Sequence, residues 1–304
     1  MHTGLWDLHL YQKAYHFLNM PCIDSPLRYP GGKTAYSSLL REIIVLNRLK
    51  GHKLAECFAG GAGASVSLLL NGTVPHIILN DYDKAIYSVW HTILRHPKKL
   101  IKWIENTPIT IETWKEQKHI YCTEKKAGFE LGVATFFLNR CNRSGIILAN
   151  PIGGIKQEGK YRIDARFNKN KLIEKIKKIS SFKKNISIYN LDALNFIELM
   201  NFSEDKVFMY FDPPYYQKGE TLYLNHYDHN GHMLLAQSIQ NTRCPWVLSY
   251  DACDSISQIY RNYPIYEKRL LYSIMPPTKG LEYIITPLIV PNEVKKARVL
   301  YSNV

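Results

Sequence analysis

Short apolar runs that alternate with helix-forming segments constrain the fold of this chain more than any other feature. The runs are rich in β-branched and aromatic residues and are apolar on both faces, which is typical of strands in a parallel sheet covered by helices. We predict strands over Lys53–Phe58, His76–Asn80, Asn185–Asn190, Val207–Phe211, Pro245–Tyr250 and Tyr283–Val290. Because proline lacks a backbone donor, Pro287 makes the last of these an edge strand or interrupts it.

Helical segments lie between these runs, over Thr34–Leu49, Ala62–Leu70, Lys84–Arg95, Asp192–Met200 and His232–Gln240. Strands and helices in alternation predict an α/β protein with a doubly wound, Rossmann-like sheet that is flanked by helices.

The charge of the chain is concentrated in its middle. The 304 residues hold 39 lysines and arginines against 26 aspartates and glutamates, a net charge of +13. Residues 98–184 hold 20 of the basic and 8 of the acidic residues, so a net charge of +12 falls there. Apolar residues recur at helical spacing between its lysines, at Leu172, Ile173, Ile176 and Ile179. We therefore predict a mainly helical, basic insert over residues 97–184 within a domain made of residues 1–96 and 185–304.

The sequence argues against several classes of protein. No apolar run approaches the roughly 20 residues that span a bilayer, and the first 20 residues lack the apolar stretch of a secretory signal. None of the six cysteines forms a C-x-x-C pair, which favours reduced thiols over a disulfide framework or a zinc ribbon. We expect a cytoplasmic protein whose basic charge favours a polyanionic partner, nucleic acid ahead of membrane.

Three histidines, His226, His229 and His232, do not predict a metal site. Their spacing distributes the side chains around a helix rather than along one face. The Asn-Gly pair before His232 is expected to break a helix, so we predict a loop there and a helix that begins near His232.

A glycine-rich segment, Glu56–Gly63, follows the first predicted strand and opens a helix. Its small residues let the backbone turn sharply and approach a ligand closely. Asp81 ends the second strand 18 residues past Gly63, where a carboxylate is placed to accept hydrogen bonds from ribose hydroxyls. Loop and acid together favour a nucleoside-containing cofactor. The loop does not have the G-x-G-x-x-G pattern of dinucleotide sites.

Upstream, the sequence Arg28-Tyr29-Pro30-Gly31-Gly32-Lys33 invites comparison with a phosphate-binding P-loop. That motif requires glycine five residues before Gly32, where this chain has Leu27, and no apolar strand precedes it. ATPase and kinase chemistry therefore lose most of their support.

The tetrapeptide Asp212-Pro213-Pro214-Tyr215 directly follows the most apolar strand, Val207–Phe211. It presents a carboxylate, a carbonyl and an aromatic ring at the end of a sheet strand, where open α/β sheets bind ligands. Such a group suits methylation of an exocyclic amine: the Asp212 carboxylate and the Pro213 carbonyl can hold the two amine hydrogens and stabilise the positive charge that develops. The Tyr215 ring can stack on a base taken out of the duplex.

Together these motifs resemble those of Dam-type DNA adenine-N6 methyltransferases, in order and spacing, from Ser25 to about Pro287. The resemblance implies a Rossmann-like methyltransferase sheet and S-adenosylmethionine as cofactor. It implies that Asp212, Pro213 and Tyr215 are catalytic. The residues that it implies for the cofactor are Tyr29, Lys33, Glu56, Phe58, Gly60, Gly63, Asp81, Asp192 and Asp212.

The resemblance also extends to DNA. The segment Phe137–Gly145 resembles the family's DNA-contacting segment, which implies double-stranded DNA as partner and the insert as its target-recognition part. The basic residues expected to contact DNA are Arg140, Arg143, Lys156, Lys160 and Arg166. The stretch from Asn150 departs from the GATC-reading members, so the recognition sequence stays open. A loop over residues 216–227 is expected to close over the flipped base.

Other interpretations remain. The same motifs are compatible with methylation of RNA adenine or cytosine N4, and with a DNA-binding module that has lost catalysis. A nicotinamide oxidoreductase leaves the Asp-Pro-Pro-Tyr motif unexplained. The sequence decides neither the oligomeric state nor whether a cognate restriction endonuclease exists.

Overall fold

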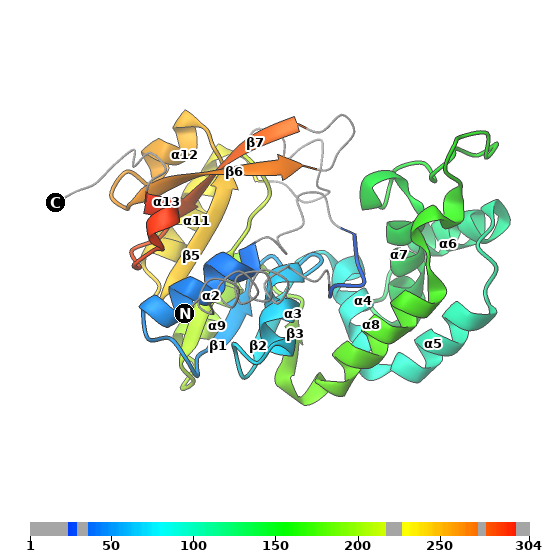
Figure 1. The fold of residues 1–304 in the computed structure, drawn as a ribbon, viewed down its shortest axis with the longest axis horizontal. Coiled ribbons are helices and arrows are strands. Elements are labelled where there is room, and N and C mark those ends of the chain that lie inside the picture. Colours follow the sequence, from blue (N-terminus) through cyan, green and yellow to red (C-terminus); the bar gives the residue numbers. More distant parts are fainter. Residues whose placement is uncertain (1–23, 29–35, 217–226, 273–277, 296–304) are drawn as a thin grey trace, which may run out of the picture.

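One mixed sheet of seven strands organises the part of the chain that the structure describes, in the order β3-β2-β1-β4-β5-β7-β6 (Figure 1). The computed structural model describes residues 24–28, 36–216, 227–272 and 278–295. The strands are β1 Lys53–Glu56, β2 Ile77–Asn80, β3 Ile186–Tyr189, β4 Val207–Phe211, β5 Trp246–Asp251, β6 Ile265–Tyr272 and β7 Thr278–Ile285. The first five strands in the sheet order are parallel, and β7 and β6 continue the sheet as an antiparallel pair.

The parallel half of the sheet confirms the sequence prediction, and β4 has the predicted bounds. The last predicted strand, Tyr283–Val290, was wrong in extent, because β7 ends at Ile285, before Pro287. Strand β6 was not predicted. It lies at the sheet edge and carries the charged run Glu267–Arg269, which hides the apolar pattern of a buried strand.

Helices cover both faces of the sheet. Helices α2 (Tyr36–Leu46), α3 (Gly63–Leu70) and α4 (Lys84–Arg95) pack on one face, and α9 (Ala193–Asn201), α11 (His229–Gln240) and α12 (Asp254–Ile259) on the other. Successive strand residues alternate between these faces: Phe208 and Tyr210 contact the first layer, and Met209 and Phe211 the second. A short helix, α13 (Asn292–Lys295), follows the sheet. This is the predicted α/β architecture.

Helix α11 begins at His229, so the expectation of a break before His232 was wrong. The Asp228 carboxylate caps the helix by accepting a hydrogen bond from the Gly231 N–H at 2.7 Å. A glycine in the first turn is tolerated because the backbone N–H groups there have no partner within the helix.

The insert is helical, as predicted, and lies beside the sheet domain (Figure 1). It consists of α5 (Pro97–Asn106), α6 (Ile111–Thr123), α7 (Phe129–Cys141) and α8 (Lys169–Ser181), with single 3-10 turns η2 (Arg143–Gly145), η3 (Ile163–Arg166) and η4 (Lys183–Asn185). Helix α7 packs against α4 so closely that a β-carbon on Gly132 would lie 2.3 Å from the Ser88 carbonyl oxygen. The apolar residues predicted for α8, such as Ile176 and Ile179, are buried. They belong to the same core as the residues of α2, α3 and α4 that pack on the sheet.

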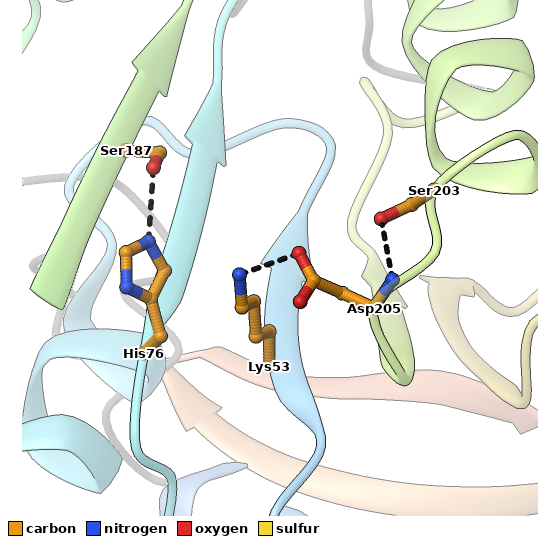
Figure 2. Close-up of polar contacts among 5 residues, drawn as sticks. All are labelled: Lys53, His76, Ser187, Ser203 and Asp205. Atoms are coloured by element: carbon orange, nitrogen blue, oxygen red, sulfur yellow. Dashed lines mark hydrogen bonds and ion pairs between the residues drawn. The ribbon is translucent and has the colours of Figure 1, made fainter.

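The amino ends of the parallel strands carry simple polar contacts (Figure 2). The Lys53 amine on β1 lies 2.5 Å from the Asp205 carboxylate, and the His76 Nε2 lies 2.9 Å from the Ser187 hydroxyl. Both partners of the ion pair are partly exposed, and pairs of this kind contribute at most about 1 kcal/mol. These contacts lie at the amino ends of the strands, at the other end of the sheet from the strand carboxyl ends.

Candidate functional site

Several of the predicted catalytic and cofactor residues, among them Glu56 and Asp212, lie at the carboxyl ends of β1 and β4. These two strands are neighbours, with Glu56 opposite Tyr210, and the Cys57 N–H donates to the Tyr210 carbonyl at 3.2 Å. The chain places β2 and β3 on one side of β1 and β4 on the other, so the direction of winding reverses here. Ligands of open α/β sheets bind at such a point. The glycine loop and Asp212 thus lie on adjacent strand ends.

The glycine loop is tied to the acid at the end of β2. The Asp81 carboxylate accepts hydrogen bonds from the Gly60 N–H at 2.8 Å and from the Asp83 N–H at 2.9 Å. On the other side of the loop, the indole of Trp90 donates to the Gly60 carbonyl at 2.9 Å. These hydrogen bonds fix Gly60, and the loop leads into helix α3 at Gly63, one residue after the predicted start of that helix at Ala62.

Asp81 is electrostatically unusual. Burial raises its pKa to about 7, and the neighbouring Asp83 carboxylate adds to the rise. The two backbone hydrogen bonds oppose that rise. The group therefore titrates near neutrality and becomes a full acceptor only as the pH rises through that range.

Asn80 fixes the strand ends around the loop, a role that the sequence did not indicate. Its amide donates to the carbonyls of Cys57 and Leu191, both at 3.0 Å, and accepts from the Leu191 N–H at 2.9 Å. The side chain is buried. It joins the chain segments that follow β1 and β3 to the end of β2, which brings Phe58 and Asp192 to the same edge.

Aromatic and acidic side chains gather at that edge. The ring of Phe58 lies 6.4 Å from the ring of Tyr227 in an edge-to-face arrangement. Burial raises the pKa of Tyr227, and the nearby charges of Cys57, Asp192 and Asp81 raise it further. The Asp192 carboxylate caps α9 through a 2.8 Å hydrogen bond from the Leu194 N–H. Carboxylate acceptors beside ring faces are the groups that a nucleoside needs, so these residues fit an adenosine-containing cofactor.

A buried relay orients Asp212. The Ser249 hydroxyl on β5 donates to Asp212 Oδ1 at 2.8 Å and accepts from the Tyr210 hydroxyl at 3.0 Å. Burial, followed by the Asp212 charge, raises the pKa of Tyr210, so this phenol keeps its proton and stays a donor. Ser249 and Tyr210 lie in strands that the sequence predicts, but no local pattern indicates this relay.

Tyr215 is also held from behind. Its hydroxyl donates to Oε1 of the buried Glu282 at 2.8 Å, and the next backbone N–H, of Tyr216, donates to Asp251 Oδ1 at 2.8 Å. Pro213, which follows Asp212 in the chain, is buried. Another predicted cofactor residue, Glu56, is buried and accepts a 2.5 Å hydrogen bond from the Ser65 hydroxyl.

Tyr29 and Lys33, also predicted for the cofactor, lie outside the described residues, as does most of the expected 216–227 loop. The preceding residue, Arg28, is described and is anchored to the insert. The buried Asn139 side chain accepts from the Arg28 N–H at 2.8 Å and donates to the Arg28 carbonyl at 2.6 Å. A β-carbon on Gly145, whose φ is +79°, would lie 2.5 Å from that carbonyl. The N-terminal motif thus starts from the corner where α7 meets η2.

The residues predicted to contact DNA differ in how they are held. Arg143, Lys156, Lys160 and Arg166 are exposed. The described structure gives none of their charged groups a hydrogen bond or ion pair. Arg140 instead donates through its guanidinium to the Arg166 carbonyl, with Nε at 2.9 Å, and to the Pro26 carbonyl at 3.5 Å. Burial, with the charges of Arg28 and Arg166, lowers the pKa of Arg140 to about 10.

The segment that carries the exposed cations, residues 143–166, has an internal frame. The Gln157 amide donates to the Ile152 carbonyl at 2.8 Å and accepts from the Ile163 N–H at 2.8 Å. At its base, the buried Asn142 accepts from the Trp114 indole at 2.7 Å. Three apolar side chains of the segment are largely exposed beside the cations, Leu148, Ile155 and Tyr161. Cations with exposed aromatic and aliphatic groups are typical of a nucleic-acid interface.

Two classes of feature are not found in the described residues. No group of three or more histidine, cysteine, aspartate or glutamate side chains there is arranged to hold a metal ion. Nor does any described helix have the length and apolar character that crossing a membrane requires.

Comparison with known proteins gives one strong match. The model of a family described as D12 class N6 adenine-specific DNA methyltransferase matches residues 29–274, most of the chain. No curated protein sequence matches.

Solved structures give weaker likenesses. An rRNA methyltransferase, aviRa, from Streptomyces viridochromogenes is 12% identical, with 88% of this chain and 87% of that chain covered and a TM-score of 0.38. A putative class I S-adenosylmethionine-dependent methyltransferase from Listeria monocytogenes is 12% identical, with 91% and 67% covered and a TM-score of 0.38. A conserved hypothetical protein from Streptococcus pyogenes is 10% identical, with 81% and 94% covered and a TM-score of 0.31.

Proposed function

The chain belongs to the D12 class of N6 adenine-specific DNA methyltransferases, and from that premise we propose how its own residues carry out the transfer. The methyl donor is S-adenosylmethionine and the acceptor is the N6 amino group of adenine in DNA. The observation that carries the residue-level proposal is the Asp212 carboxylate at the end of β4, held by Ser249 and adjacent to the glycine loop after β1.

The cofactor is held by the carboxyl edge of β1, β2 and β3. Asp81 accepts hydrogen bonds from the ribose hydroxyls, Asp192 from the adenine amino group, and Phe58 lies against the ring. The backbone of Gly60 and Gly63 lets the ligand approach closely, and Glu56 lies on the methionine side, together with Tyr29 and Lys33. The hydrogen-bonding groups of the protein support this assignment. Two carboxylates near aromatic rings can accept hydrogen bonds from the hydroxyl and amino groups of adenosine.

Asp212 and Pro213 activate the target amine. The lone pair of an adenine amino nitrogen is delocalised into the ring, so the amine is a poor nucleophile. The Asp212 carboxylate and the Pro213 carbonyl each accept one amine hydrogen, which favours a pyramidal nitrogen with its lone pair available. The bound cofactor supplies an electrophilic methyl group attached to a sulfonium sulfur. As positive charge grows on the nitrogen, the Asp212 carboxylate stabilises it, and the Ser249 hydrogen bond keeps that carboxylate oriented. The carbon–nitrogen bond forms as the carbon–sulfur bond breaks, which would leave a neutral thioether, and the methylated nitrogen then releases one proton to solvent.

Tyr215 holds the flipped base. Its ring offers a stacking face beside the two acceptors, which offsets part of the cost of removing the adenine from the duplex. Placing the nitrogen in line with the transferred methyl group provides the proximity contribution to the rate.

The insert, residues 97–184, is the part that binds DNA in this proposal. Arg143, Lys156, Lys160 and Arg166 contact phosphates or base edges, because they are exposed and their charged groups form no hydrogen bond or ion pair in the described structure. Arg140 has a structural role in addition to the predicted DNA contact, since carbonyl oxygens already accept its N–H groups. We place the protein in the cytoplasm, where it reaches the nucleoid DNA.

Nucleoside analysis and sequencing test this proposal together. DNA methylated by the purified protein is digested to nucleosides, and N6-methyladenine is the expected product. N4-methylcytosine, or methyl transfer to RNA alone, would overturn it. Methylation-sensitive long-read sequencing of DNA from expressing cells then gives the recognition sequence. Cleavage of DNA that lacks the methyl mark, in an extract of the same cells, would reveal a cognate restriction endonuclease.

A further inference from the structure

A buried carboxylate lies directly behind the catalytic motif. Glu282, on β7, has none of its surface exposed, and its two oxygens accept hydrogen bonds from two tyrosines. The Tyr215 hydroxyl donates to Oε1 at 2.8 Å, and the Tyr36 hydroxyl donates to Oε2. Burying a carboxylate is unfavourable unless donors satisfy it, so a carboxylate at this position needs these partners.

The sheet register places a second carboxylate next to the first. Asp251 on β5 lies directly opposite Glu282 on β7, and side chains of opposed residues point to the same face. Like charges in such a pair repel each other, so a sheet that served only for stability would avoid them. Here each carboxylate holds one part of the catalytic segment: Glu282 the hydroxyl of Tyr215, and Asp251 the N–H of Tyr216 at 2.8 Å. Tyr215 is thus held both at its hydroxyl group and through the backbone of the residue that follows it.

The surroundings keep Tyr36 as a donor to Glu282. Burial, followed by the Glu282 charge, raises the pKa of Tyr36 well above its ordinary value, so its phenol keeps the proton. The Lys268 amine on β6, which is opposite Glu282 in the sheet register, lies 4.6 Å from the centre of the Tyr36 ring. The positive charge of Lys268 is attracted to the face of the Tyr36 ring, and it also lies on the strand next to the negative charge of Glu282.

We propose that Glu282 is a positioning residue for methyl transfer, which holds the Tyr215 ring in the orientation that receives the flipped adenine. This inference rests on the proposed stacking role of Tyr215. Glu282 itself touches neither base nor cofactor in this account. It acts by restricting rotation of the Tyr215 ring, so that the stacking face is formed before the base arrives.

A double-variant cycle under single-turnover conditions tests this inference. Tyr215→Phe keeps the ring and removes its hydroxyl. We expect it to lower the transfer rate about fivefold to tenfold, the effect of one hydrogen bond. Glu282→Leu is expected to cause a similar loss alone and no further loss when Tyr215 is already phenylalanine. Glu282→Gln, which keeps one acceptor oxygen, is expected to retain more of the rate. The affinity for S-adenosylmethionine, measured separately by calorimetry, stays unchanged in all of them.

A fluorescence measurement provides a readout that does not require transfer. With 2-aminopurine in place of the target adenine, we expect stacking on Tyr215 to quench the fluorescence of the flipped base and Glu282→Leu to lose that quenching. Tyr36→Phe is the matched control, because it removes the other partner of the same carboxylate and leaves the Tyr215 bond intact. We expect it to have the smaller effect on both readouts.

Additive losses from Glu282 and Tyr215 would overturn the inference, as would full quenching in Glu282→Leu. If Glu282→Leu does not fold, the same cycle with Glu282→Gln gives the coupling. The failure of the proposed function is a separate result, since it appears in the wild-type protein as an absence of N6-methyladenine.

Discussion

The polar side chains behind the Asp-Pro-Pro-Tyr motif and those of segment 143–166 are held in opposite ways. Behind the motif, Ser249 and Glu282 are buried and hydrogen-bonded to Asp212 and Tyr215. On the segment, Arg143, Lys156 and Lys160 are exposed, with no hydrogen bond or ion pair to their charged groups in the described structure. The comparison separates two physical needs. Activating an amine requires acceptors fixed in advance, whereas binding phosphates requires charge and reach.

Arg140 and Arg143 repeat this contrast within one motif. Both come from the segment that sequence analysis assigned to DNA, three residues apart. Arg140 donates to backbone carbonyls and joins α7 to η3, whereas Arg143 extends from η2 into solvent. Residue type and spacing do not distinguish them, but their hydrogen bonds do.

The largest expected effect is on the buried side of the comparison. Asp212→Ala removes the acceptor and the charge that stabilise the developing positive nitrogen. We expect the transfer rate at saturating DNA to fall about a hundredfold to a thousandfold, measured with tritiated S-adenosylmethionine. Lys53→Ala is the control. Because its ion pair lies at the amino end of β1, away from Asp212, we expect this variant to leave the rate unchanged. A rate that survives in Asp212→Ala would remove this residue from the mechanism.

Changes to the exposed cations of segment 143–166 should affect the affinity for DNA. Replacing Arg143, Lys156 and Lys160 together by alanine is expected to weaken DNA binding about a hundredfold at low salt. The slope of log affinity against log salt should become shallower by about 0.9 for each phosphate that the variant no longer neutralises. Fluorescence anisotropy across a salt series measures both. Affinity for S-adenosylmethionine serves as the internal control, and a parallel decrease there would mean that the segment also supports the cofactor site.

Ser249→Ala tests how much the relay behind Asp212 contributes. It removes one hydrogen bond to a carboxylate, so we expect the rate at saturating DNA to fall about tenfold, with DNA affinity unchanged. Ser255→Ala, on the nearby α12, is a serine control outside the relay. A decrease in DNA affinity rather than in rate would contradict this prediction, because it would mean that Ser249 supports DNA binding and not Asp212.

The pH dependence of cofactor binding should follow Asp81. Because its pKa is raised to about 7, the Asp81 carboxylate, which we propose accepts hydrogen bonds from the ribose hydroxyls, forms only as the pH rises through neutrality. We expect affinity for S-adenosylmethionine to increase several-fold from about pH 6 to pH 8. The increase should be absent in Asp81→Asn. Calorimetric titration at constant ionic strength measures it, and an unchanged slope in that variant would assign the titration to another group.

The same group has a smaller effect on stability, with the opposite sign. A folded-state pKa above the ordinary value means that the folded protein holds this proton more tightly than the unfolded chain. The resulting stabilisation is complete below about pH 4 and is lost as the pH rises through about 7. Thermal unfolding of Asp81→Asn should therefore lack this part of the pH dependence in that window.

The sequence predicts those features that neighbouring residues determine, and it does not predict contacts between residues far apart in the chain. Strand β4 and helix α4 were predicted with their observed bounds, because an apolar run and a local periodicity specify them. The positions of the glycine loop and Asp212 after β1 and β4 follow from the same apolar runs, and the roles of these residues stay predictions. The partners that hold them were not found, since Tyr215 and Glu282 are 67 residues apart and Arg28 and Asn139 are 111 apart. No local pattern marks such pairs.

Strand β6 was missed for a related reason. Its run Glu267–Arg269 is polar, and its strand character comes from pairing with β7 at the sheet edge rather than from burial. The start of α11 at His229 was misjudged because the stabilising effect of the Asp228 cap outweighs the low helix propensity of Gly231.

One pair of variants tests the central comparison most directly. DNA affinity and the single-turnover rate of methyl transfer at saturating DNA are measured for Ser249→Ala and Arg143→Ala side by side. The account predicts that Ser249→Ala lowers the rate and keeps the affinity, while Arg143→Ala weakens the affinity and keeps the rate. It is contradicted if the two variants exchange these effects, or if each changes both quantities equally.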